Sequence, residues 1–129
     1  MNNSEAIKNI LIFDDDVKTA EMLAEYLKVA SKAAVSLAHY EDDFWKAYQP
    51  EKLDIIFLDY RLSDQFSGID ILKKLSEKDN TVPVVMMTGE GSEETAVEAM
   101  QSGAFDYLVK GKYEFSQINN LIEKAVRFR

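Results

Sequence analysis

Short apolar runs alternate along the whole chain with segments whose apolar residues recur at helical spacing. The run over residues 9–14 is apolar up to its final acid and predicts a strand. Residues 17–30 then change to helical spacing and predict a helix. The apolar positions of that helix are Ala20, Leu23, Ala24 and Leu27. The chain therefore begins with a strand followed by a helix.

The same pair of signals recurs four more times. The further predicted strands cover residues 33–38, 53–58, 82–87 and 106–110. The helices that follow them end near residue 48, run from 68 to about 78, run from 93 to 102, and close the chain. The apolar face of the last helix consists of Ile118, Leu121, Ile122, Ala125 and Val126. Five strands are thus predicted to alternate with five helices.

These strands are continuously apolar over five or six residues, which is typical of parallel strands covered by helices on both faces. Pro83 fits near the start of a strand, where its missing N–H disturbs the sheet least. Right-handed crossovers leave few topologies, and the common doubly wound order for five such units is 2-1-3-4-5. We therefore predict an α/β fold, a doubly wound five-stranded parallel sheet of flavodoxin-like type with five flanking helices.

The composition is that of an ordinary globular domain. The chain has 129 residues, of which 47% are hydrophobic and 29% charged. We expect a single domain over residues 1–129 with its core at about 8–127, and we find no internal repeat and no effector domain in the sequence. The chain is then either a stand-alone unit or one part of a longer protein.

Charge and residue usage exclude several kinds of chemistry. With 23 acidic and 15 basic residues the net charge is −8, which disfavours direct binding to nucleic acid or to an anionic membrane surface. The absence of Cys excludes disulfides and thiolate sites, and the single His39 cannot form an imidazole cluster. No apolar stretch of about 18 residues and no signal-peptide core occur, so we expect a cytoplasmic protein.

Polar side chains stand where four of the predicted strands end. They are Asp14, Asp15 and Asp16 after the first strand, Asp59 after the third, Thr88 after the fourth and Lys110 after the fifth. Each has an ordinary interpretation as a helix cap, loop acid, turn residue or exposed lysine. In the predicted order, however, these strands are consecutive neighbours, and the chain direction switches between the first and the third. We therefore expect the groups to meet in one crevice at the carboxyl edge of the sheet.

The charges of these groups indicate their chemistry. Two carboxylates about 4 Å apart repel by roughly 4 kcal/mol at an effective dielectric constant near 20, so Asp14, Asp15 and Asp59 need compensation. Oxygen ligands with room for water suit Mg²⁺ or Mn²⁺. Such an ion would also neutralise a phosphoryl group, while Lys110 and Thr88 hold its remaining oxygens. Asp59 is then placed as the nucleophile that forms an aspartyl phosphate.

Four segments carry a family resemblance. They are ILIFDDD at 10–16, IFLDYRL at 56–62, VVMMTG at 84–89 and GAFDYLVK at 103–110. Over nearly its whole length the chain resembles the response-regulator receiver domain of two-component signalling, in the CheY-like superfamily. The resemblance implies that Asp59 is the phosphoacceptor, that Asp15, Asp59 and the backbone carbonyl of Arg61 ligate Mg²⁺ or Mn²⁺, and that Asp14 acts through a metal-bound water.

The resemblance also implies a switch and a set of partners. Thr88 and Lys110 are expected to contact the phosphoryl group, and Tyr107 is the aromatic residue whose side chain follows Thr88. The phosphodonor is then a sensor histidine kinase or a histidine phosphotransfer protein. The output surface would be formed by the helix at 93–102, the strand at 106–110 and the last helix, which is also the candidate surface for a homodimer. The protein is in that case a stoichiometric phosphoacceptor rather than an enzyme, with at most self-catalysed phosphorylation and dephosphorylation.

Three positions depart from the family pattern. Position 63 is Ser where receivers usually carry Pro, and Gly68 comes nine rather than eight residues after Asp59, so we expect a loop that is one residue longer. Gly111 replaces the Pro that usually follows the lysine. Because a cis bond to a non-proline residue costs about 2.5–4 kcal/mol, we expect a trans peptide there.

Arg61 and Glu90 are candidates for tuning the lifetime of the phosphorylated state. They could pair over the site, or they are two exposed charges worth less than about 1 kcal/mol together. We assign His39 and Trp45 to structural roles, since neither is expected near a strand end that lines the crevice.

Two other functions compete with the phosphorylation switch. The altered loop and Gly111 leave open a receiver-like protein-interaction module that does not use phosphorylation. A haloacid-dehalogenase-like phosphohydrolase also forms an aspartyl phosphate, after its first strand, in the pattern Asp-x-Asp-x-Thr/Val. Here DDDVK at 14–18 places Lys18 at the last position, and the chain is short for a substrate-covering cap. The sequence therefore favours the switch.

Overall fold

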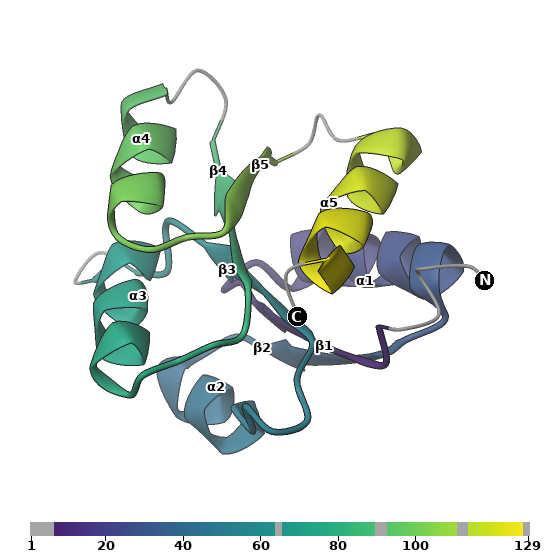
Figure 1. Ribbon diagram of the computed structural model, residues 1–129. Helices are drawn as coiled ribbons and strands as arrows, with labels where there is room; N and C mark the ends of the chain where they lie inside the picture. The colour runs from purple at the N-terminus through teal and green to yellow at the C-terminus, as the bar shows by residue number, and fades with distance from the viewer. Residues whose placement is uncertain (1–6, 64–65, 90–92, 111–113, 128–129) are drawn as a thin grey trace.

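The computed structural model describes residues 7–63, 66–89, 93–110 and 114–127. Strands and helices alternate strictly along these residues (Figure 1). The strands are β1 (Asn9–Phe13), β2 (Ala34–Ala38), β3 (Ile55–Asp59), β4 (Val84–Thr88) and β5 (Asp106–Val109). The helices are α1 (Val17–Ser31), α2 (Glu41–Ala47), α3 (Gly68–Glu77), α4 (Glu93–Gln101) and α5 (Phe115–Arg127).

The strands form one parallel five-stranded sheet in the order β2-β1-β3-β4-β5, so the predicted fold class and topology are confirmed. The register pairs Phe13 with Leu58, and Asp59 with Met87. Thr88 in turn lies opposite Val109. The carboxyl ends of β1, β3, β4 and β5 are therefore level with one another, and the residues that follow them project at the same edge.

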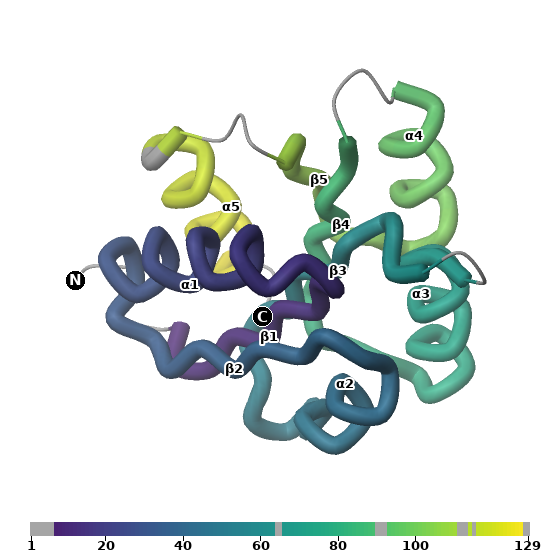
Figure 2. The backbone as a smooth tube through the Cα atoms, turned by 180° about the vertical axis from the view of Figure 1, so that it is seen from behind, coloured from purple at the N-terminus to yellow at the C-terminus, as the bar shows by residue number. Residues whose placement is uncertain are grey.

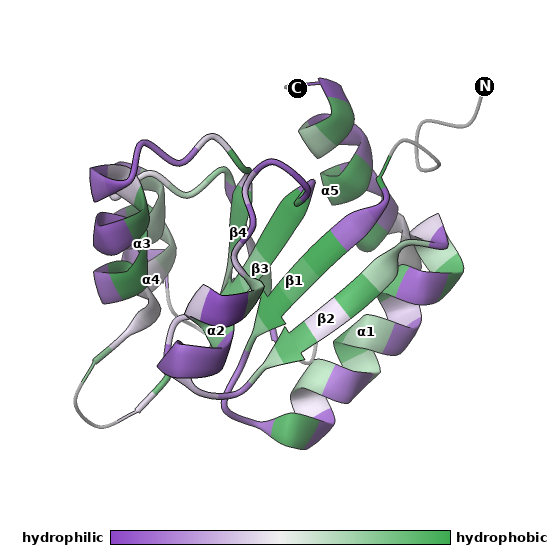
Figure 3. Ribbon diagram, turned by 90° about the horizontal axis from the view of Figure 1, so that it is seen from below, coloured by the Kyte–Doolittle hydropathy of each residue, from purple (hydrophilic) through white to green (hydrophobic). Residues whose placement is uncertain are grey.

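Helices cover both faces of the sheet. Figures 1 and 2 show α1 and α5 together on one face, and α2, α3 and α4 on the other. Alternate residues of β1 supply the two cores, because successive strand side chains point to opposite faces. Ile10 and Ile12 pack with the first pair of helices, and Leu11 and Phe13 with the second set. Coloured by hydropathy, the strands are largely apolar while the helices carry both apolar and polar residues (Figure 3).

The element bounds differ from the predicted ones by one or two residues. The largest differences are at β3 and β4, which begin two residues later than expected, at Ile55 and Val84. Before β3, the Asp54 carboxylate accepts hydrogen bonds from the backbone N–H groups of Lys8 and Asn9, so this residue serves as a side-chain anchor. Before β4, Pro83 has no N–H to donate, and it accepts a hydrogen bond at its carbonyl from the N–H of Ile56. Within the described residues, none of the helices has the length and apolar character needed to cross a membrane.

Candidate functional site

Three aspartates converge at the carboxyl edge of the sheet. Asp14 and Asp15 follow β1, and Asp59 is the last residue of β3. Each can offer one carboxylate oxygen such that the three atoms lie within 4.8 Å of one another. Asp14 is 0% and Asp59 4% exposed, whereas Asp15 is exposed to solvent. The expected acid cluster therefore exists, with two members fixed in the protein interior and one at its surface.

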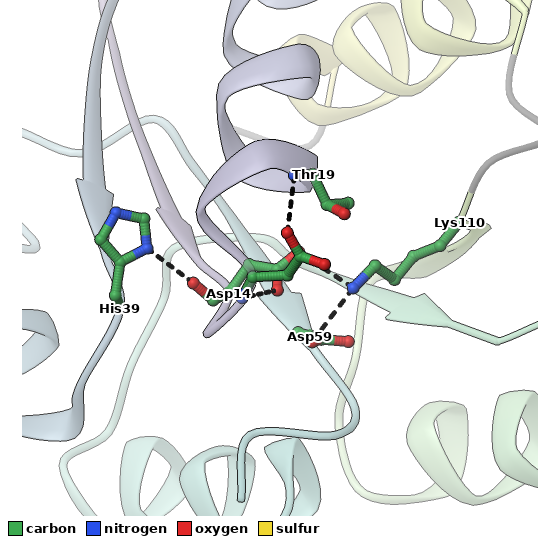
Figure 4. A network of polar contacts seen from close by, with 6 residues as sticks. Asp14, Thr19, His39, Asp59 and Lys110 are labelled. Atoms are coloured by element: carbon green, nitrogen blue, oxygen red, sulfur yellow. Dashed lines mark hydrogen bonds and ion pairs between the residues drawn. The ribbon is translucent and has the colours of Figure 1, made fainter.

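Lys110 connects the two buried acids across the sheet. Its Nζ lies 3.0 Å from Asp14 Oδ2 and 3.2 Å from Asp59 Oδ2 (Figure 4). The backbone N–H of Lys110 donates to the carbonyl of Thr88 at 2.8 Å, which extends the pairing of β4 with β5 by one residue. That bond fixes the base of the lysine side chain, so its ammonium reaches from the β5 end over to β3 and β1.

The arrangement perturbs the ionisation of Asp59. Burial and the neighbouring Asp14 carboxylate raise the pKa of Asp59 from 3.8 to about 7, against the opposing effect of the Lys110 ammonium. Burial disfavours the charged form of Lys110, but the Asp59 and Asp14 carboxylates outweigh it and raise the pKa of the lysine. Two acids thus share one cation, which leaves the cluster short of positive charge.

The donor set suits a divalent cation. Asp14 Oδ1 accepts the backbone N–H of Asp16 at 2.9 Å, while Oδ2 is fully buried and makes no hydrogen bond to another described residue. Among the described residues, the Lys110 ammonium is therefore the one group that compensates the negative charge of Oδ2. Hard oxygen ligands with an excess of negative charge are the environment that Mg²⁺ or Mn²⁺ prefers. The residues present therefore fit such an ion.

An open cavity of about 490 Å³ leads to the cluster. Its lining consists of Asp15, Asp16, Asp59, Tyr60, Arg61, Gly89, Thr95 and Lys110. A larger cavity of about 770 Å³ lies at the opposite, amino edge of the sheet, but no cluster of metal-ligating groups was found there among the described residues. The carboxyl edge is therefore the candidate site because of its acid cluster, although its cavity is the smaller of the two.

Asp16 has a different role from its two neighbours. Its side chain accepts the backbone N–H of Thr19 at 3.1 Å and caps α1, and this hydrogen bond lowers the pKa of Asp16. The helix-cap interpretation that the sequence left open for all three acids thus applies to Asp16.

Thr88 and Tyr107 lie on the same face of the sheet. Thr88 is 1% exposed and ends β4, opposite Val109 of β5. Because side chains alternate along a strand, Tyr107, two residues before Val109, points to the same side as Thr88. The Tyr107 side chain is 42% exposed. The two residues therefore share a face of the sheet, with the tyrosine exposed, and their role as a switch pair stays a prediction.

Gly68 packs directly against the backbone of Asp59. A Cβ atom added at this position would lie 2.5 Å from the Asp59 carbonyl oxygen and 2.9 Å from Met86 Sδ. The N–H of Gly68 also donates to the carbonyl of Tyr60 at 2.7 Å. The glycine thus allows the start of α3 to approach the end of β3, nine residues after the aspartate. Residues 64–65 of the connecting loop lie outside the described residues.

The expectation that His39 lies away from the strand ends of the crevice is wrong. The residue directly follows β2, and its Nδ1 lies 2.8 Å from the backbone carbonyl oxygen of Asp14 (Figure 4). The edge strand β2 is thus followed by a side chain that contacts the backbone of the acid cluster. No sequence pattern predicts this contact, because it joins a side chain to a main-chain oxygen 25 residues away.

Other site assignments have mixed outcomes. Trp45 lies on α2, packs on Phe44 and donates its indole N–H to Glu41, as a structural residue would. Arg61 lines the cavity and is exposed. Glu90 and Gly111 lie outside the described residues, so the pairing of Arg61 with Glu90 and the peptide after Lys110 stay predictions. The sequence did not single out Tyr60 and Thr95, which also line the cavity.

Comparisons with known proteins agree with this geometry. Residues 10–123 match the response regulator receiver domain. The chain is 33% identical over 118 residues to the transcriptional regulatory protein ZraR of Salmonella typhimurium strain LT2, covering 92% of this chain and 26% of that protein. It is 32% identical to the DNA-binding transcriptional regulator NtrC of Proteus hauseri, covering 92% of this chain and 24% of that one. The chain therefore spans about a quarter of the length of these relatives.

A solved structure supports the same assignment. The receiver domain of NtrX from Brucella abortus superposes with a TM-score of 0.82 at 28% identity, over 92% of this chain and 98% of that one. The sheet order, the acid cluster at its carboxyl edge and the match over residues 10–123 lead to one conclusion. The chain belongs to the response regulator receiver domain family.

Proposed function

We propose that the protein is a phosphorylation-dependent signalling switch whose phosphoacceptor is Asp59. The observation that carries the proposal is the setting of this carboxylate: it is 4% exposed, lies at the end of a cavity, and shares one lysine with Asp14. In such surroundings the ionised carboxylate has an unfavourable free energy. A bound cation lowers this free energy, and so does a reaction that moves the negative charge onto a group that cations contact. Receiver domains of two-component response regulators, the family of this chain, act in phosphorylation-dependent signalling.

We assign a divalent cation, Mg²⁺ or Mn²⁺, to the acid cluster. Asp15, Asp59 and the backbone carbonyl of Arg61 would hold it, and Asp14 would act through a bound water. The supporting observations are the grouping of the three carboxylates within 4.8 Å and the buried Oδ2 of Asp14, whose one described cationic neighbour, Lys110, is shared with Asp59. When bound, the ion neutralises negative charge on the carboxylates and on the incoming phosphoryl oxygens.

Lys110 and Thr88 would hold the phosphoryl group. The lysine ammonium, which pairs with Asp59 at 3.2 Å in the unmodified protein, would transfer this contact to a phosphoryl oxygen. The Thr88 hydroxyl, at the end of the neighbouring strand, would donate to another. Asp59 attacks the phosphorus of the donor, the donor's leaving group departs with its bonding electrons, and the aspartyl phosphate remains. Arg61, which lines the cavity, and Glu90 would tune its lifetime.

The output surface would consist of α4, β5 and α5. Movement of Thr88 toward the phosphoryl group would draw Tyr107, on the same face of the sheet, inward from its exposed position. Val97, Met100 and Tyr107 are large apolar residues exposed on α4 and β5 and would contact a downstream partner or a second copy of the chain. A sensor histidine kinase or a histidine phosphotransfer protein is the proposed phosphodonor, and the cytoplasm the proposed location.

The test is phosphoryl uptake from a small-molecule donor. Purified protein is incubated with acetyl phosphate and Mg²⁺, and the intact mass is measured. We expect one phosphoryl group per chain in the wild type and in the exposed control Asp42→Asn, and none in Asp59→Asn. Uptake by Asp59→Asn would overturn the assignment of the phosphoacceptor.

The same preparation separates the competing functions. We expect beryllofluoride with Mg²⁺ to shift backbone amide resonances of α4 and β5. Absence of both this shift and phosphoryl uptake would favour an interaction module that does not use phosphorylation. Sustained release of phosphate over many turnovers would favour a phosphohydrolase.

A further inference from the structure

His39 supplies a hydrogen bond to the backbone of the acid cluster from the edge strand. Its ring is half-buried directly after β2, and its Nδ1 lies 2.8 Å from the carbonyl oxygen of Asp14 (Figure 4). Because a carbonyl oxygen can only accept, Nδ1 must carry the proton and donate. Both the Nδ1-protonated neutral ring and the imidazolium meet this condition. The contact therefore does not depend on the charge of the histidine.

This bond fixes the peptide group that joins Asp14 to Asp15. The carbonyl of Asp14 and the N–H of Asp15 belong to one rigid plane. The preceding peptide is also held, since the N–H of Asp14 donates to the carbonyl of Ala38 at 3.0 Å. The end of β2 thus forms a hydrogen bond with the peptide group on each side of the Asp14 Cα. One bond comes from the backbone of Ala38 and the other from the side chain of His39.

The position of Asp15 depends on these two hydrogen bonds more than the positions of Asp14 and Asp59 do. Asp14 and Asp59 are buried, and both pair with Lys110. The Asp15 carboxylate is exposed, and in the described part of the chain no hydrogen bond or ion pair holds it. Its location is therefore set by the backbone that carries it. A rotation about the Cα–C bond of Asp14, which would turn the carbonyl away from His39, would displace the Asp15 Cα, and the carboxylate with it, from the other two acids.

We propose that His39 is a positioning residue for the divalent-cation site: by donating to the Asp14 carbonyl, it holds the Asp14–Asp15 peptide in the orientation that aims the Asp15 carboxylate at Asp59. The inference rests on the metal site of the proposed function. It differs from a purely structural role, in which the bond merely fastens β2 to β1 and its loss lowers stability without changing metal affinity.

The test uses the geometry of amide side chains. The amide nitrogen of Asn reaches the position of Nδ1 of His, whereas that of Gln reaches the position of Nε2. Metal affinity is measured by calorimetric titration with Mn²⁺ for the wild type, His39→Asn, His39→Gln and His39→Leu. We expect His39→Asn to bind within about twofold of the wild type, and the other two to bind about tenfold more weakly, as residues that orient metal ligands commonly do when removed.

A second substitution tests whether the effect passes through Asp15. Asp15→Asn alone should weaken Mn²⁺ binding strongly, and adding His39→Gln to it should cause little further loss, because the carboxylate that His39 positions is then absent. In the metal-free protein, the amide resonance of Asp15 should shift in His39→Gln and not in His39→Asn. A bond that only fastens the two strands would leave the Mn²⁺ affinity of His39→Gln alone at the wild-type value.

Specific results would overturn the inference. One is wild-type Mn²⁺ affinity in both His39→Gln and His39→Leu; another is an equal loss in His39→Asn and His39→Leu. Should His39→Leu fail to fold, the comparison of the Asn and Gln variants still decides, with circular dichroism as the check on folding. The titration needs no phosphodonor, so Mn²⁺ binding through Asp15 without phosphoryl uptake would refute the proposed function and leave this inference intact. A wild type that binds no Mn²⁺ would overturn the inference.

Discussion

Two buried aspartates stand at opposite ends of β3, and their surroundings differ. Asp54, 5% exposed, precedes the strand and accepts the backbone N–H groups of Lys8 at 2.7 Å and Asn9 at 2.9 Å. Asp59, 4% exposed, ends the strand and faces a second carboxylate with one shared lysine. The burial is the same, but one acid meets neutral donors aimed at it and the other meets a like charge.

The difference shows that burial alone does not make an acid reactive. A carboxylate that accepts backbone N–H groups is satisfied, and it stabilises the loop that supplies them. A carboxylate that faces another is held in an unfavourable state that a proton, a cation or a covalent change can relieve. In this chain the first acid anchors the start of β1 to β3, and the second lies in the candidate site. Substitutions at the two ends of β3 should therefore have different consequences.

The largest effect is expected at the anchoring acid. Asp54→Ala leaves the N–H groups of Lys8 and Asn9 without their acceptor in a part-buried position and should lower the free energy of unfolding by about 3 kcal/mol. Asp54→Asn keeps one oxygen acceptor and should lose about half as much. Urea unfolding followed by circular dichroism measures both values. Phosphoryl uptake at Asp59 should persist in Asp54→Asn, and its loss would contradict the division of roles.

A comparable loss is expected where α3 meets Asp59. The Cβ of Gly68→Ala would lie 2.5 Å from the Asp59 carbonyl oxygen, so the helix start must shift, and we expect a loss of about 2 kcal/mol. Because the shift displaces the backbone of the phosphoacceptor, phosphoryl uptake should also slow. Gly89→Ala is the matched control for stability, since nothing lies within 4 Å of a Cβ at that position. Equal stability of the two variants would show that the close approach of α3 is not needed.

Much of this could be predicted from the sequence. Continuous apolar strands and helical spacing gave the sheet order, and placing polar residues at the ends of neighbouring strands brought Asp14, Asp15, Asp59 and Lys110 together. The strand starts at Ile55 and Val84 were not predicted correctly. The apolar runs begin two residues earlier, but the anchoring Asp54 precedes β3 and Pro83 precedes β4. The periodicity of hydrophobic residues reports which side chains face the core, and that is the information the fold requires.

The contacts of the site were less accessible to this reasoning. The bond from His39 to the Asp14 carbonyl and the position of Thr95 in the cavity lining depend on how segments distant in the sequence approach in space. The distinction between Asp54 and Asp59 is of the same kind. Both are acids beside apolar runs in the sequence, and their different partners come from opposite edges of the sheet.

A smaller effect, with a defined pH dependence, is expected from Asp59→Asn. The pKa of Asp59 is about 7 in the folded protein against an ordinary value of 3.8. Between these two values the folded chain retains a proton that the unfolded chain releases, so this group lowers stability progressively as the pH rises from about 4 to 7. Asp59→Asn removes the charge and should stabilise the protein by about 1–2 kcal/mol at pH 8, with the gain disappearing near pH 4.

Thermal unfolding across this pH range checks the sign. Addition of Mg²⁺ at pH 8 should raise the melting temperature of the wild type and have much less effect on Asp59→Asn, because the ion relieves the same repulsion. A stabilisation by Asp59→Asn that does not change with pH would show that the carboxylate is not held in an unfavourable ionised state. Asp54→Asn should instead destabilise the protein at pH 8.

The smallest effect on stability is expected from removing the Tyr60 hydroxyl, which links the carboxyl end of β3 to α4. Tyr60, directly after the phosphoacceptor, donates its hydroxyl to Glu98 Oε1 at 3.1 Å, and this hydrogen bond raises the pKa of the tyrosine. Since the pair is exposed, Tyr60→Phe should cost no more than about 0.5 kcal/mol. Tyr48→Phe is the control, because Tyr48 donates to Asn80 at 2.8 Å and neither residue lines the candidate site.

The two tyrosine variants should differ in what they disturb. Tyr60 connects the end of β3 with a helix of the proposed output surface, whereas the Tyr48 bond joins the segments that follow α2 and α3. Amide spectra of Tyr60→Phe should therefore show shifts along α4 in the unmodified protein and a smaller response of α4 to beryllofluoride. The response in Tyr48→Phe should match that of the wild type. If both variants respond as the wild type does, the bond to Glu98 does not transmit the state of Asp59, and the coupling must pass through Thr88 and the strands alone.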